Sequence, residues 1–126
     1  MDITGNKKIF HDFFLKEIKN EYGVAGLWGN IYAESSGRPN NLQNSYESKL
    51  GYTDETYTKA VDDGTYLNFV YDSAGYGLAQ WTYYSRKQNL LEFAKEQNAS
   101  IADFQMQLQF LLKELKEYYT TVFNTL

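Results

Sequence analysis

The residue of this sequence that is best suited to take part in a reaction is Glu34, in the stretch YAESSGRPNNL. Apolar spacing predicts a helix from Val24 to Ser35, and Glu34 falls in its last turn on the face of Leu27 and Ile31. Partial burial and the negative end of the helix dipole both favour the protonated form of a carboxyl group, which suits a general acid. The residues alone leave a second interpretation equally open, in which the stem of Glu34 packs and its head reaches solvent or pairs with Arg38.

Other kinds of chemistry find little support in the residue types. The sequence contains no cysteine and one histidine, His11. Thiol catalysis, disulfides and cysteine-ligated metals are therefore excluded, and nothing resembles the nucleophile elbow of a catalytic triad. The run Asp62-Asp63-Gly64 lacks the alternating ligand spacing of a calcium loop. We therefore expect neither a metal nor a cofactor.

The elements that must position Glu34 are mostly helical. Periodicity predicts helices over residues 5–20 and 24–35, a short helix capped by Thr53, a helix over 84–97, and a last helix opened by Ser100 with Asp103. In the helix over 84–97, Arg86 and Lys87 are assigned to the solvent face. Residues 40–73 are polar and rich in turns, and YLNFVYDS within them fits a short strand or an extended loop. We expect one domain, residues 1–126, mainly α, with a loop-rich insert and at most a short β-element.

The charge balance limits the partners. A net charge of −4 and a pI near 4.9 argue against nucleic acid, because phosphate binding depends on clustered Lys and Arg. No apolar run is long enough for a membrane span, and MDITGNKK lacks the apolar stretch of a signal peptide. Aromatic residues make up 17% of the chain, a surplus that can fill a core or line a ligand site.

Two motifs in order carry a resemblance to a known family. GLWGNIYAESSGRPNNLQ, followed by DSAGYGLAQWT, resembles the phage tail lysozyme family of the lysozyme-like superfamily, which is related to goose-type lysozymes and soluble lytic transglycosylases. The shared features are a Glu-Ser pair at a helix end and a later Gly-Leu-x-Gln element, here Gly77 to Gln80. The resemblance covers most of the chain and implies an α+β lysozyme-like fold.

The resemblance also implies an activity and the residues that perform it. The reaction is cleavage of the β-1,4 bond between N-acetylmuramic acid and N-acetylglucosamine in peptidoglycan, by a muramidase-type glycosidase. Glu34 corresponds to the catalytic acid and Gln80 to a glutamine that faces the cleft, while Trp81 and Tyr76 would border the sugar. Tyr83 is a further candidate for holding the glycan, with packing at the entry of the next helix as its alternative.

The second catalytic group is open at this level. Glycosidases usually pair two carboxylates. Asp72 is the first choice because it directly precedes the Gly-rich element, and Asp63 and Asp62 are alternatives. Each could instead be a loop residue that bonds its own backbone. No second carboxylate is needed in a lytic transglycosylase, which works with one Glu because the muramyl 6-hydroxyl attacks in place of water.

Rival functions and the biological setting complete the expectations. The alternatives to a hydrolase are a lytic transglycosylase, an inactive glycan-binding module, and a helical structural domain. The family's domain usually runs further than TTVFNTL, so we expect a C-terminally shortened, monomeric domain of a larger lysin with a fused wall-binding or tail module. Its partner would be the glycan strands of bacterial peptidoglycan. As a phage-encoded protein it would act from the host cytoplasm on the wall, or from the virion tail.

Overall fold

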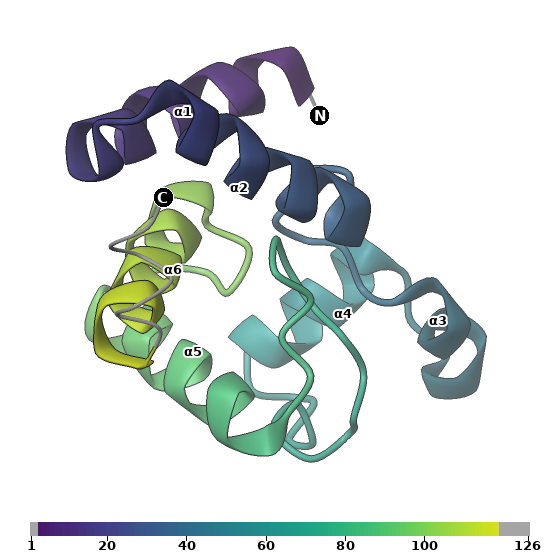
Figure 1. Cartoon of the computed structure of the whole chain (residues 1–126). Coiled ribbons are helices and arrows are strands. Elements are labelled where there is room, and N and C mark those ends of the chain that lie inside the picture. The colour runs from purple at the N-terminus through teal and green to yellow at the C-terminus, as the bar shows by residue number, and fades with distance from the viewer. Residues whose placement is uncertain (1–2, 119–126) are drawn as a thin grey trace.

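The computed structural model describes residues 3–118. Within them six helices follow along the chain: α1 (Ile3–Ile18), α2 (Glu21–Ser35), α3 (Asn44–Leu50), α4 (Asp54–Asp62), α5 (Tyr84–Glu96) and α6 (Phe104–Tyr118). Figure 1 shows α1 and α2 packed along one side, α5 and α6 as a second pair, and α3 and α4 beyond the long loop that precedes α5. The predicted mainly α fold is confirmed.

The first helix pair is joined by a tight connection at Asn20. Lys19 takes a left-handed conformation with φ of 59°, and the Asn20 side chain accepts hydrogen bonds from the N–H groups of Tyr22 and Gly23. An asparagine at this position satisfies N–H groups that a helix start otherwise leaves free. As a result α2 begins at Glu21, earlier than the predicted start at Val24.

Aromatic side chains fill the space between α1 and α2. The rings of Phe10 and Phe14 lie 4.7 Å apart, and the ring of Phe10 lies 5.1 Å from that of Trp28. All three side chains are buried. Much of the aromatic surplus in the sequence therefore serves the core, where tilted and edge-on ring contacts add to the burial of apolar surface.

The loop-rich insert contains one predicted helix and one unpredicted helix. The predicted helix is α4, which Thr53 caps through reciprocal hydrogen bonds with Thr56. The unpredicted helix is α3, which has no fully buried residue and packs only Tyr46 and Leu50 partly against the core, so its apolar pattern is weak. YLNFVYDS is irregular rather than a strand. In the described part of the chain, β pairing is limited to isolated antiparallel bridges from Tyr76 to Leu42 and to Trp81.

The turn that connects the second helix pair, α5 and α6, is held by side-chain hydrogen bonds of Asp103 and Ser100. Asp103, and not Ser100, caps α6 by accepting a hydrogen bond of 2.8 Å from the N–H of Met106. Ser100 instead donates its hydroxyl hydrogen to Asp62 at the end of α4. These contacts attach the turn before α6 to the C-terminal end of α4.

A buried glutamine on α6 connects three separate segments. Gln107 has no exposed surface, and its Nε2 donates to the carbonyl oxygens of Pro39 at 2.7 Å and Ile101 at 2.6 Å. Its Oε1 accepts a hydrogen bond of 3.0 Å from the N–H of Leu78. One side chain thus satisfies three buried backbone groups from loops on either side of the molecule.

Replacing Gln107 by Ala is expected to destabilise the fold by at least about 2 kcal/mol, because unsatisfied buried polar groups cost about 1–3 kcal/mol each. Urea denaturation measures this loss as a lower free energy of unfolding. Gln109→Ala is the matched control, since Gln109 lies exposed on the same helix and its replacement should change stability by less than about 0.5 kcal/mol. Equal stability of the two variants would show that Gln107 does not hold the loops.

Candidate active site

Glu34 lies at the C-terminal end of α2, with its side chain exposed to solvent. The helix ends directly afterwards, where Ser36 adopts φ of 57° and its N–H donates to the carbonyl oxygen of Tyr32 at 2.8 Å. The predicted position in the last turn is confirmed, whereas the predicted partial burial is wrong. The buried stripe of α2 consists of Val24, Trp28, Ile31 and Ser35. Glu34 lies next to this stripe rather than within it.

The turn that follows Glu34 is fixed to the core at Gly37. This residue has φ of 74°, and a Cβ atom placed on it would lie 2.5 Å from Cη2 of Trp28. No other residue type fits this combination of backbone angle and close contact. From α1, Asn6 donates a hydrogen bond of 3.2 Å to the Gly37 carbonyl oxygen. The chain therefore leaves α2 in one defined direction.

The two motifs of the sequence lie side by side in the structure. The N–H of Gly77 donates to the carbonyl oxygen of Asn41 at 3.0 Å, and the N–H of Gln43 donates to that of Gly75 at 2.8 Å. The Gln43 side-chain oxygen accepts the N–H of Gly75 in return, at 3.0 Å. In Figure 1 the loop between α4 and α5 reaches towards the end of α2. The Gly-rich element is thus held against the segment that follows Glu34.

Gln80 fastens this loop with its side-chain amide. Its Nε2 donates to the carbonyl oxygens of Asn41 at 2.8 Å and Gly77 at 3.0 Å, and its backbone has φ of 48°. A Cβ atom at Gly75 would lie 2.7 Å from Oε1 of Gln80. The glycine therefore leaves room for the glutamine side chain, which remains partly accessible.

Tyr76 and Trp81 are core residues, so the prediction that they border a sugar is wrong. Neither side chain is exposed. The Tyr76 hydroxyl is hydrogen-bonded to that of Thr58, and the indole N–H of Trp81 donates to Glu114 at 2.9 Å. The prediction of a ligand site rests on their neighbours in sequence, two glycines and a glutamine. In the structure both rings lie in the core and anchor the Gly-rich loop to it. Burial also raises the pKa of the Tyr76 hydroxyl above its ordinary value.

Tyr83 is exposed, contrary to the interpretation that it packs at the helix entry. It directly precedes α5, and 63% of its surface is accessible. Its ring lies 4.8 Å from that of Tyr84, which in turn stacks on Tyr71 at 6.0 Å. The structure therefore places Tyr83 in a group of surface tyrosines and not in the core.

Asp72 lies in a buried network instead of facing solvent. Its side chain is 1% exposed and forms an ion pair of 2.6 Å with Lys87, whose side chain is fully buried. The carboxylate also accepts hydrogen bonds from the hydroxyls of Tyr57 and Tyr66 and from the N–H of Ala74. All the accepting positions of this carboxylate are occupied, which leaves none to activate water or contact a sugar.

Lys87 is the residue of this network that the sequence assignment missed. The sequence-based prediction assigns Lys87 to the solvent face of this helix. In the structure Lys87 instead lies on the buried face of α5, together with Leu90 and Ala94. Its spacing of three and seven residues from these apolar positions is the signal that would have identified it. Burial lowers the pKa of the Lys87 ammonium group, and the hydrogen bond to Asp72 opposes that shift.

The two alternative carboxylates cap local structure. Asp62 accepts the Ser100 hydroxyl and the N–H of Ile101, whereas Asp63 pairs with Lys59 at 3.1 Å. Hydrogen bonds from Thr65 hold the pKa of Asp63 below its ordinary value, so this carboxylate stays ionised. Both residues line an open hollow beside α4. Glu34 is not among the residues that line this hollow.

Two acidic residues that were not predicted as site residues, Glu47 and Asp54, lie close to each other and to Arg38 in the turn after α2. Arg38 binds Asp54 at 3.3 Å, so the alternative ion pair of Arg38 with Glu34 does not form. Asp54 also accepts the N–H of Leu42 at 2.9 Å. A hydrogen bond with Asp54 raises the pKa of Glu47, and Arg38 partly opposes this effect. Residues from α3, α4 and the turn after α2 are thereby drawn together.

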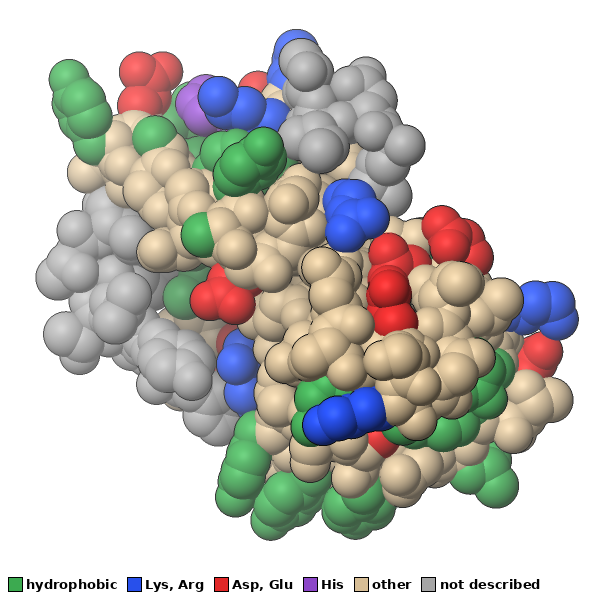
Figure 2. Space-filling view, turned by 90° about the vertical axis from the view of Figure 1, so that its right-hand side faces the viewer, with side chains coloured by type: hydrophobic (Ala, Val, Ile, Leu, Met, Phe, Trp, Pro, Cys, Tyr) green, Lys and Arg blue, Asp and Glu red, His purple; other side chains and the backbone are tan. Residues whose placement is uncertain are grey.

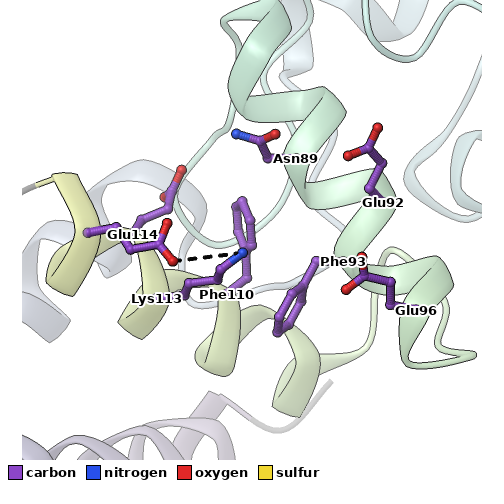
Figure 3. A pocket seen from close by; sticks show the side chains of 8 residues that line it. Asn89, Glu92, Phe93, Glu96, Phe110, Lys113 and Glu114 are labelled. Atoms are coloured by element: carbon purple, nitrogen blue, oxygen red, sulfur yellow. Dashed lines mark ion pairs between the residues drawn. The ribbon is translucent and has the colours of Figure 1, made fainter.

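A further hollow between α5 and α6 contains none of the predicted site residues. Figure 3 shows Phe93 and Phe110 between the two helices, with carboxylates around them. The ring centroids of Phe93 and Phe110 are 5.5 Å apart. Glu114 is committed to Trp81 and to an ion pair of 2.7 Å with Arg86. The residues that line this hollow therefore pack α5 against α6 and stabilise the fold.

No group of three or more His, Asp or Glu side chains in residues 3–118 is arranged to hold a metal ion. Within the same residues no helix has the length and apolar character needed to cross a bilayer.

Comparisons with known proteins give one informative match. A model of the family described as phage tail lysozyme matches residues 5–126, which is nearly the whole chain. Neither the curated proteins nor the solved structures include a match.

Proposed function

Because the chain belongs to the phage tail lysozyme family, a family of peptidoglycan-lytic proteins, we propose that it is a muramidase with Glu34 as the general acid. The bond cleaved is the β-1,4 linkage between N-acetylmuramic acid and N-acetylglucosamine. The observation that supports this role is the exposed Glu34 carboxyl group at the end of α2, next to the loop that Gln80 fastens.

Glu34 would protonate the glycosidic oxygen as the bond breaks. Gln80 would orient the glycan through its partly accessible side chain. The end of α2 fixes the backbone position of Glu34, and the hydrogen bonds of Gln80 hold the neighbouring loop, which supports the positioning that catalysis requires.

A single-acid reaction is the second candidate function, and the burial of Asp72 favours it. With all four of its contacts inside the protein, Asp72 is poorly placed as a second catalytic carboxylate. A lytic transglycosylase needs only the acid, since the muramyl 6-hydroxyl replaces water as the nucleophile. The two candidates share Glu34 and differ in the end that they leave on the product.

Digestion of purified peptidoglycan tests the proposal. Wild-type protein is expected to release fragments with new reducing ends, which mass spectrometry identifies as hydrated muramic acid. Fragments with 1,6-anhydro ends would replace the muramidase by the transglycosylase. The absence of both kinds of end would rule out glycan cleavage by this chain.

A further inference from the structure

Three neighbouring tyrosines form an exposed aromatic surface, which we call the tyrosine platform: Tyr71, Tyr83 and Tyr84. They are 69%, 63% and 49% exposed, respectively. The rings of Tyr71 and Tyr84 are 6.0 Å apart and inclined by only 20°, and the ring of Tyr83 is 4.8 Å from that of Tyr84. A contiguous exposed apolar patch can mark an interaction site, so this grouping calls for an explanation.

The platform is held in place from beneath by the buried ion pair. Tyr71 directly precedes Asp72, and the backbone carbonyl of Tyr83 accepts the N–H of Lys87 at 3.0 Å. The contact of 2.6 Å between Asp72 and Lys87 therefore joins the loop that carries Tyr71 to the start of α5. A surface that is ordered before binding loses less conformational entropy when a ligand binds.

The platform lies away from the end of α2. In Figure 1, α5 begins at the lower end of the molecule, whereas α2 lies along the upper side. Figure 2, turned about the vertical axis, shows hydrophobic side chains gathered along the same lower edge. Glu34 and the platform are thus on different parts of the surface.

The size of the platform favours a small or chain-like ligand over a second protein. Aromatic residues present about 150–250 Å² each, so three that are half to two-thirds exposed offer roughly 300–500 Å². A stable protein interface needs about 800 Å² from each partner. A second copy of this chain would therefore find too little surface here.

The chemistry of the platform favours a neutral ligand. Lys87 is buried beneath it, and the guanidinium group of Arg86 pairs with Glu114 on α6. Anionic polymers are bound by accessible clusters of Lys and Arg, and the platform consists of tyrosines instead. Tyrosine offers a flat apolar face and a hydroxyl group, which match the C–H face and the hydroxyl groups of a sugar ring.

We propose that the tyrosine platform binds the neutral sugar rings of a glycan strand as an accessory site, separate from the site of cleavage. The choice of glycan as ligand rests on the proposed function. The stacked pair of Tyr71 and Tyr84 would pack an outer ring face on a sugar ring, and Tyr83 would add its hydroxyl group and ring edge. A strand held here stays close to the protein after each cleavage.

Binding to insoluble peptidoglycan tests this site. All proteins carry Glu34→Gln, so that the ligand is not consumed, and the bound fraction is measured by co-sedimentation. Each of Tyr71→Ala and Tyr84→Ala is expected to raise the dissociation constant about two- to tenfold, and the double variant at least tenfold. Tyr22→Ala is the matched control, because Tyr22 is 91% exposed on α2 outside the platform, and it should leave binding unchanged.

The outcomes separate the accessory site from the proposed function. Unchanged binding of the double variant, or equal weakening by Tyr22→Ala, would overturn the platform. A dimer in sedimentation velocity that the double variant abolishes would overturn it in favour of a contact between copies. Loss of binding in the double variant supports the platform even if wild-type protein yields no cleavage products, in which case only the proposed function fails. Thermal melting of each variant checks that it is folded.

Discussion

Glu34→Gln is expected to reduce peptidoglycan cleavage by about a hundredfold to ten-thousandfold, because the amide cannot donate the proton that a general acid supplies. The fold should be unaffected. The Glu34 side chain is exposed, and none of the hydrogen bonds and ion pairs within residues 3–118 involves it. Surface substitutions of this kind usually change stability by less than about 0.5 kcal/mol. The measurement is the rate of appearance of new reducing ends, with thermal melting of the same samples.

Glu21→Gln is the matched control for this experiment. Glu21 is an exposed acid on the same helix, in its first turn. Cleavage by this variant should equal that of wild type. If Glu34→Gln retains full activity, Glu34 is not the acid. If neither wild type nor variant cleaves, but both bind peptidoglycan, the chain is a glycan-binding module.

Lys87→Met is expected to lower the free energy of unfolding by about 3–5 kcal/mol, the range for removing one partner of a buried ion pair. The cause is the Asp72 carboxylate, which would remain buried without its positive partner. The methionine side chain fills a similar space, so loss of charge and not loss of volume dominates the effect. Asp72→Asn should also destabilise, since it leaves the buried ammonium of Lys87 without its counter-charge. Urea denaturation measures both losses.

The double variant Asp72→Asn with Lys87→Met separates charge pairing from packing. It should recover much of the stability lost in each single variant, because no uncompensated charge is left in the interior. Lys95→Met is the control, as Lys95 lies exposed on the same helix and its replacement should be nearly neutral. Lys87→Met with the stability of wild type would show that the pair does not stabilise the fold. An Asp72→Asn variant that is folded at the assay temperature but inactive would restore a catalytic role for Asp72.

Local pattern predicted much of the helical framework. The helices around Phe10, Val24, Thr53 and Leu90 follow from apolar periodicity and capping residues, which depend on neighbours in the sequence. The helix α3 was missed because its apolar pattern is weak. The position of Glu34 at a helix end follows from the same local signals. The exposure of its side chain does not follow from them.

The burial of the aromatic and charged residues around the second motif depends on partners that are distant in the sequence. Trp81 and Tyr76 can be buried without an unsatisfied polar atom, because Glu114 on α6 accepts the indole N–H and the Thr58 hydroxyl is hydrogen-bonded to that of Tyr76. Nothing in the spacing of Asp72 pointed to Lys87 as its partner. Such pairings are decided by how helices pack, and they cannot be inferred from one stretch of sequence.

The three hydrogen bonds of Gln107 affect the order in which the site is completed during synthesis. Gln107 and Pro39 are separated by 68 positions, and the same side chain holds Leu78 in the Gly-rich loop. Domains fold as their chains emerge from the N-terminus. Both motifs therefore leave the ribosome before the residue that ties them together, and a nascent chain carries Glu34 without an assembled site. We therefore expect the loops beside Glu34 to become ordered only after α6 has been synthesised.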